Sequence, residues 1–170
     1  MYRCIVLAYD GTREGRSALR EGALLARSWG SKLVLLSVIA ETAGLQIGES
    51  ALPGALLREE EAYRAILQEG ADRLRSLGFE PEARLVQGEP TRAIAGVAAE
   101  VGADLVVVGH RKRGPLARWW SGSTGAYLLD HIGCSLLVAR TILSDEAFAA
   151  AFDRIQGAAP SGAGGPDAPV

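Results

Sequence analysis

Five short apolar runs divide the chain, and segments with a different hydrophobic spacing separate them. The runs cover residues 4–8, 33–39, 81–87, 105–108 and 135–139, of which 81–87 is the weakest. Each run is bounded by glycine, proline, acidic or hydroxyl residues, which is typical of β-strands. Since most runs are apolar at consecutive positions, they predict strands of a parallel sheet that is covered on both faces.

Between the runs, apolar residues return every three or four positions, which is the spacing of amphipathic helices. The longest such segments are residues 13–29, with Ala18, Gly22, Leu25 and Trp29, and residues 56–77, with Tyr63, Leu67, Gly70, Leu74 and Leu77. Pro90, after the turn of Gly88 and Glu89, is placed to start a helix whose apolar face carries Ile94, Val97, Ala98 and Val101. Further helices are predicted over residues 123–131 and around Phe148, Phe152 and Ile155. Strands that alternate with helices predict a doubly wound α/β fold with a single five-stranded parallel sheet.

One globular domain accounts for most of the 170 residues, of which 48% are hydrophobic. We place this domain at residues 1–141, with a flexible segment at 40–54. Residues 142–156 are predicted to form a helical extension. Residues 157–170, rich in Gly, Ala and Pro, are expected to be a disordered tail.

Charge and targeting signals narrow the possible partners. The net charge of −2 gives no general attraction to nucleic acid, so any anion site must be local. No apolar run approaches the roughly 18 residues of a membrane span, and no signal peptide is evident, so we expect a cytoplasmic protein without a membrane partner. Cys4 and Cys134 stand beside strands without metal-ligand spacing and are expected to be buried thiols.

Two strand ends carry the candidate chemistry, because ligands of such folds bind where the strands end. Asp10 follows the first strand and Gly109 the fourth, and the two face one cleft if these strands are neighbours. Residues 109–124 add four cations and the run Gly122-Ser123-Thr124 at the start of a helix. Free N–H groups at a helix start favour phosphate, although the same residues are ordinary helix caps.

Taken together, these motifs resemble the universal stress protein family over about residues 1–141. The nucleotide-binding members carry Gly-x2-Gly-x9-Gly-Ser or Gly-Thr, and this chain has Gly109-x2-Lys112-x9-Gly122-Ser123. The spacing matches, but Lys112 replaces the second glycine. The Asp10-Gly11-Thr12 turn, Gly88-Glu89-Pro90 and the run from Ala103 to Gly109 match in the same order.

The resemblance implies a Rossmann-like sheet with strand order 3-2-1-4-5 and a homodimer that forms through Ser135–Ala139. It also implies a stress-response regulator that binds ATP, with or without Mg²⁺, and whose nucleotide state changes its binding to a protein partner. The implied nucleotide-binding residues are Ala8, Tyr9, Asp10, Val38, Gly109, Arg111, Lys112, Gly122, Ser123 and Thr124.

Lys112 leaves a second interpretation open. Its β-carbon occupies a place where backbone near phosphates favours glycine, yet its ammonium group is itself suited to a polyphosphate. The alternative is a nucleotide-free dimeric scaffold whose basic loop binds a small anion or a protein. We find no catalytic set of residues and expect no enzyme, and Trp119-Trp120 alone is a poor indication of nucleic-acid binding.

Overall fold

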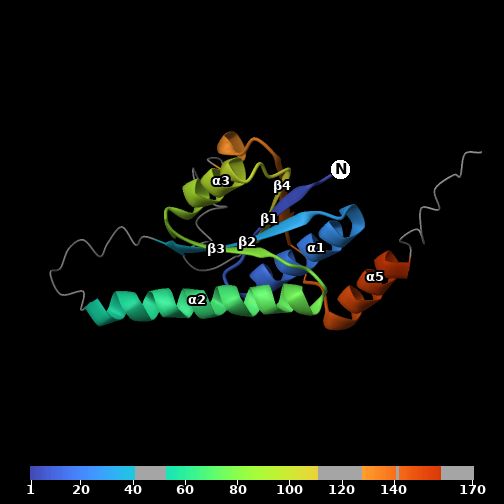
Figure 1. Ribbon diagram of the computed structural model, residues 1–170, viewed down its shortest axis with the longest axis horizontal. Helices are drawn as coiled ribbons and strands as arrows, with labels where there is room; N and C mark the ends of the chain where they lie inside the picture. The colour runs from blue at the N-terminus through green and yellow to red at the C-terminus, as the bar shows by residue number, and fades with distance from the viewer. Residues whose placement is uncertain (41–52, 111–127, 141, 158–170) are drawn as a thin grey trace, which may run out of the picture.

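The computed structural model describes residues 1–40, 53–110, 128–140 and 142–157, and a parallel sheet lies at its centre (Figure 1). Within these residues the sheet has five strands in the order β3-β2-β1-β4-β5, and every neighbouring pair is parallel. The strands are β1 (Cys4–Ala8), β2 (Lys32–Ala40), β3 (Glu82–Gly88), β4 (Leu105–Gly109) and β5 (Ser135–Ala139). The predicted architecture and strand order are therefore confirmed.

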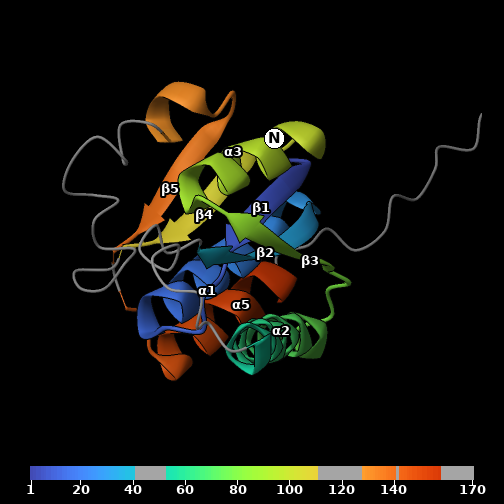
Figure 2. The ribbon, with the colours of Figure 1, turned by 90° about the vertical axis from the view of Figure 1, so that its left-hand side faces the viewer.

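Helices cover both faces of the sheet. On one face lie α1 (Arg13–Trp29), α2 (Pro53–Ser76) and α5 (Asp145–Gly157), while α3 (Pro90–Glu100) and a short helical segment at 128–131 lie on the other (Figures 1 and 2). The segment 128–131 is the described part of the helix predicted at 123–131.

The side chains of alternate strand residues point into two separate apolar cores, one on each face of the sheet. In β1, Ile5 and Leu7 point into the core under α1 and α2, whereas Val6 points into the core under α3. The central strands β1, β2 and β4 are buried over most of their length. Because both faces of these strands are buried, their sequences read as continuous apolar runs rather than as alternating ones.

Helix α1 packs closely because its buried face carries small residues. A β-carbon on Gly22 would lie 2.2 Å from Cδ2 of Leu7, so a larger residue here would force the buried Leu7 side chain to move. Trp29, predicted on the same buried face, is instead 49% exposed. It lies in the last turn, beyond the sheet contact, and its ring packs edge-on against Tyr2 at a centroid distance of 6.4 Å.

Helix α3 begins where the sequence predicts, after the turn of Gly88 and Glu89, with Pro90 in its first turn. The Glu89 carboxylate accepts hydrogen bonds from the backbone N–H groups of Thr91 and Arg92, at 3.1 and 2.9 Å. Burial alone would raise the pKa of Glu89, but these bonds and one from the Thr91 hydroxyl hold it below its ordinary value.

Other differences from the sequence predictions are small. Ala40 belongs to β2, Pro53 to α2 and Gly157 to α5, so the predicted flexible segment and tail each lose residues at their borders. The rest of both segments, 41–52 and 158–170, lies outside the described residues. Both cysteines are free thiols; Cys4 is buried as predicted, but Cys134 is only half-buried.

Candidate functional site

The two strand ends that carry Asp10 and Gly109 are neighbours in the sheet. β1 pairs with β4 in the register Ile5 to Leu105 and Leu7 to Val107, so both strands end at the same edge. β2 flanks β1 on its other side, and the N–H of Tyr9 donates to the carbonyl of Leu36 at 2.8 Å. The structure thus places both predicted strand-end residues where ligands of such sheets bind.

Gly109 lies directly against the first turn of α1. A β-carbon at this position would be 2.6 Å from the carbonyl carbon and oxygen of Glu14 and 2.9 Å from the nitrogen of Gly15. Its φ is not in the left-handed region. Close backbone packing, rather than an unusual turn, therefore requires glycine here, and it fixes the start of the 109–124 segment beside α1.

Asp10 organises the turn between β1 and α1. Its Oδ1 accepts hydrogen bonds from the N–H and the hydroxyl of Thr12, at 3.0 and 2.5 Å. The Thr12 hydroxyl oxygen in turn accepts from the N–H of Gly15 at 3.1 Å and so caps α1. Asp10 thus supports the helix cap indirectly, and its carboxylate is held at the positive end of the α1 dipole.

Tyr9 turns its side chain away from this edge and into the core under α2, where it is only 3% exposed. Its hydroxyl donates to Glu69 of α2, which also pairs with Arg73 and, at 3.6 Å, with Arg16. Burial, followed by the bond to the Glu69 carboxylate, raises the pKa of Tyr9 to about 12. The backbone of Tyr9 remains at the strand end, but its side chain anchors β1 to α2.

Ala8 and Val38 lie on the opposite face of the sheet from the Tyr9 side chain. Both are half-buried and pack against the core under α3. Ser37, which sequence reasoning did not single out, is fully buried and donates its hydroxyl to the carbonyl of Tyr9 at 2.7 Å. This bond ties the ends of β1 and β2 together, so the backbone around Ala8 and Val38 is fixed.

Sequence reasoning also missed the role of α2 at this site. Glu69 bonds to Tyr9, and a β-carbon on Gly70 would lie 2.7 Å from the Tyr9 ring. Ile66 packs against Gly11, whose φ of +72° requires glycine. The helical spacing that included Gly70 indicated a buried face, but no sequence signal connects Glu69 with Tyr9, 60 positions away.

Half of the predicted nucleotide-binding residues, namely Arg111, Lys112, Gly122, Ser123 and Thr124, lie outside the described residues. Their roles remain predictions. The described residues lead directly to them, because the N–H of His110 donates to the carbonyl of Ala139 at 2.9 Å. This bond extends the pairing of β4 with β5 to the start of the segment.

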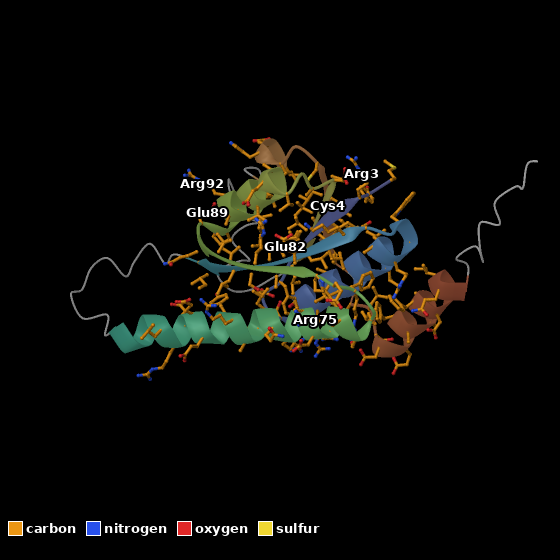
Figure 3. All side chains as sticks on the ribbon, in the orientation of Figure 1. Arg3, Cys4, Arg75, Glu82, Glu89 and Arg92 are labelled. Carbon is orange, nitrogen blue, oxygen red and sulfur yellow. The ribbon has the colours of Figure 1, made fainter. Side chains whose placement is uncertain are left out.

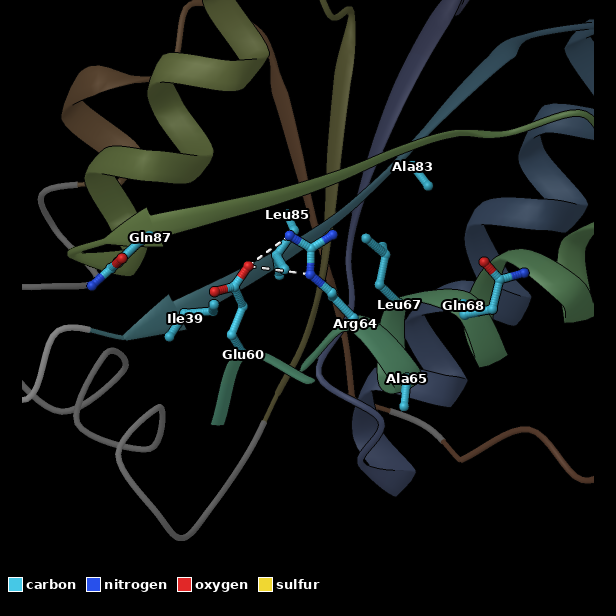
Figure 4. Close-up of a pocket in the computed structure, with 9 residues that line it drawn as sticks. All are labelled: Ile39, Glu60, Arg64, Ala65, Leu67, Gln68, Ala83, Leu85 and Gln87. Atoms are coloured by element: carbon cyan, nitrogen blue, oxygen red, sulfur yellow. Dashed lines mark hydrogen bonds and ion pairs between the residues drawn. The ribbon is translucent and has the colours of Figure 1, made fainter. Parts of the chain in front are cut away.

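A groove of about 750 Å³ lies apart from these residues, between α2 and the strands β2 and β3 (Figure 4). Its floor includes Leu67 and Leu85, and Arg64 projects between them while it pairs with Glu60 at 2.6 Å. None of the predicted site residues lines this groove.

In the part of the chain that the structure describes, no three His, Cys, Asp or Glu residues are grouped as a metal site would need. Within the same residues, no helix has the length and apolar character needed to cross a membrane.

The model of the universal stress protein family matches residues 1–140. The chain belongs to the universal stress protein family. A relative from Thermus aquaticus, "Universal stress protein in QAH/OAS sulfhydrylase 3'region", is 30% identical over 140 residues, which are 82% of this chain and all of the relative.

Solved structures of the family have the same fold. A universal stress protein in complex with cAMP is 26% identical, with a TM-score of 0.62 over 82% of this chain and 98% of its own. A family protein from Burkholderia pseudomallei is also 26% identical, with a TM-score of 0.62 over 81% of this chain and 95% of its own. The family match ends before α5.

Proposed function

We propose that this universal stress protein is a regulatory protein that binds ATP at the joint carboxyl ends of β1 and β4. The observation that carries the proposal is the contact of Gly109 with the backbone of Glu14 and Gly15. It brings the start of the glycine-containing segment 109–124 against the α1 cap that Asp10 and Thr12 form. The family relative solved with cAMP supports an adenine nucleotide as the ligand.

Each part of the nucleotide has a candidate partner in this proposal. The carboxylate of Asp10 accepts hydrogen bonds from the ribose hydroxyls, and the fixed backbone near Ala8 and Val38 flanks the base. Arg111, Lys112 and the N–H groups at Gly122, Ser123 and Thr124 hold the phosphates, with or without Mg²⁺. The protein works in the cytoplasm as a homodimer that forms through β5, and nucleotide binding changes its affinity for a protein partner rather than supporting catalysis.

Lys112 favours a second candidate function. A family member with a lysine in place of the second loop glycine has a β-carbon where the backbone approaches phosphate. If this excludes the nucleotide, the protein is a nucleotide-free scaffold that uses the same sheet and the same dimer.

Calorimetric titration of the nucleotide-stripped protein with ATP, with and without Mg²⁺, separates the two functions, and cAMP serves as a second ligand. The parent should bind ATP saturably, and Asp10→Ala should weaken binding at least about tenfold, since it loses hydrogen bonds to a charged acceptor. Arg75→Gln, on the outer surface of α2 (Figure 3), is the matched control and should bind like the parent.

Two other outcomes decide against ATP binding by the parent. Absence of binding by the parent with recovery in Lys112→Gly supports the scaffold. Absence in both proteins contradicts the nucleotide site itself. Sedimentation of the parent tests the dimer: a monomer at micromolar concentration would contradict the proposed assembly through β5.

A further inference from the structure

A second, smaller cleft lies where α1, the end of α2 and the start of α5 meet. It has a volume of about 190 Å³, and three arginines line it: Arg16 and Arg20 from α1 and Arg73 from α2. Leu19, Leu77 and Phe148 form its apolar walls. We call it the arginine cleft. None of these residues belongs to the proposed ATP site.

Three of the residues that line the arginine cleft are cationic, and one, Asp145, is acidic. Glu69 and Asp145 form ion pairs with the three guanidinium groups, and the charge of Arg20 also acts on the exposed Glu146, whose pKa it helps to lower. Arg73 hydrogen-bonds to Oε1 of Glu69, and Arg16 reaches the same oxygen only at 3.6 Å, which is longer than a hydrogen bond. One carboxylate oxygen therefore serves two arginines.

Burial increases this imbalance at Arg20. The side chain of Arg20 is 21% exposed, whereas its partner Asp145 is 83% exposed, so water screens the carboxylate far more than the guanidinium. Arg16 and Arg20 are also four positions apart on α1, where like charges repel each other. The apolar walls strengthen this field because they lower the local dielectric constant.

From this geometry we infer that the arginine cleft binds a single phosphate group, as inorganic phosphate or as a phosphomonoester. Its volume is below the roughly 300–1,000 Å³ of ordinary small-molecule pockets, which suits one small oxyanion better than a whole nucleotide. Guanidinium groups bind phosphate through paired, charge-assisted hydrogen bonds, and a doubly charged anion offsets the repulsion among the three arginines.

A phosphate here would also strengthen the contact of α5 with α1 and α2. Helix α5 lies beyond the family match. Arg20 already hydrogen-bonds to the carbonyl of Leu143 and to Asp145, at the start of α5, and its guanidinium lies 5.9 Å from the centroid of the Phe148 ring. An anion held by Arg20 and Arg73 would join α1, α2 and the attachment of α5. The site would thereby connect an anion signal to the position of the C-terminal helix.

The test is calorimetric titration of the full chain with inorganic phosphate, and separately with phosphoserine, in phosphate-free buffer. We expect saturable binding with one phosphate per chain. Arg20→Gln and Arg73→Gln should each weaken it at least about tenfold, because each loses charge-assisted hydrogen bonds. The matched control Arg75→Gln loses a comparable α2 ion pair with Asp72 outside the cleft and should bind like the parent.

Lys112→Ala distinguishes the arginine cleft from the proposed ATP site. It removes a cation of the segment 109–124 and none of the arginine cleft. Phosphate binding should survive this change, whether or not ATP binding does. Arg73→Lys keeps the charge but loses the planar fork, so it should weaken binding less than Arg73→Gln does and serves if the latter does not fold.

Hydrogen exchange gives an independent readout: saturating phosphate should slow exchange of the α5 amides in the parent and not in Arg20→Gln. Phosphoserine binding with similar affinity would identify a phosphomonoester as an acceptable source, and binding of inorganic phosphate alone would restrict the site to the free ion. No saturable binding, or loss in Lys112→Ala with retention in the arginine variants, overturns the inference.

Discussion

At several positions of this protein, neighbouring atoms occupy the space that a β-carbon would need, so these positions favour glycine. Gly22 meets Leu7, Gly70 meets the Tyr9 ring, and Gly109 meets the backbone of Glu14 and Gly15. The obstacle at Gly109 is main chain, which cannot rotate aside as a side chain does. Among these three contacts, the one at Gly109 therefore leaves the least room for adjustment, and it lies at the proposed ATP site.

Gly109→Ala should lower the free energy of unfolding by about 1–3 kcal/mol, because the new β-carbon forces β4 and α1 apart. The matched control is Gly96→Ala, on the exposed side of α3, where a β-carbon meets nothing within 4 Å. It should stabilise the protein by about 0.5–1 kcal/mol, since alanine favours the helix. Urea unfolding of both variants measures the two changes; equal effects would refute the packing role of Gly109.

At the scale of elements, α5 is attached mainly by aromatic side chains. Phe152 is 5% exposed and lies with its ring centroid 6.3 Å from Phe79 and 5.5 Å from Phe148. The guanidinium of Arg27 lies 4.9 Å from the ring centroids of both Phe79 and Phe152. Its buried Nε has no hydrogen-bond partner among the described residues, so the two ring faces are its main compensation there.

Phe152→Ala should destabilise the protein by about 3–5 kcal/mol, because it leaves a cavity and removes one of the two aromatic rings that contact Arg27. Exchange of the α5 amides should rise far more than that of β1 or β4. Asp153→Ala, at an exposed neighbouring position, should change stability by less than about 0.5 kcal/mol. If Phe152→Ala accelerates exchange throughout the sheet to the same degree, α5 is part of the central cooperative unit and not a separately attached helix.

At the scale of the whole molecule, stability should fall at both ends of the pH range. Hydrogen bonds from the N–H groups of Arg3 and Cys4 hold the pKa of Asp104 below its ordinary value, and bonds from Lys32 and Arg84 do the same for Glu82. Carboxylates with lowered pKa values stabilise the fold above their ordinary range near pH 4, and this contribution is lost as the pH falls through the lowered values.

Tyr9 should account for part of the loss of stability at alkaline pH. Its pKa is raised to about 12 from an ordinary 10, so the folded state holds the proton more tightly than the unfolded chain. The contribution of this proton to the free energy of unfolding is fully present below pH 10. It falls by about 2–3 kcal/mol between about pH 10 and 12.

Urea unfolding at pH 8 and pH 11 should therefore show a smaller alkaline loss in Tyr9→Phe than in the parent. Tyr2→Phe, whose ring packs on Trp29, should retain the parent's alkaline loss. If Tyr9→Phe loses as much stability between pH 8 and pH 11 as the parent does, the assigned role of the Tyr9 and Glu69 pair is contradicted.

The sequence by itself determined the strands and most helix limits, because burial on both faces leaves continuous apolar runs and burial on one face leaves helical spacing. Its motifs identified the family and therefore the strand order. The tertiary structure decided which residues meet. The contact of Gly109 with α1, the bond of Tyr9 to Glu69 and the position of Arg27 between two rings join residues that are far apart in the chain. Such contacts depend on how helices lie across the sheet, and hydrophobic spacing specifies only which face of a helix is buried, not what it meets.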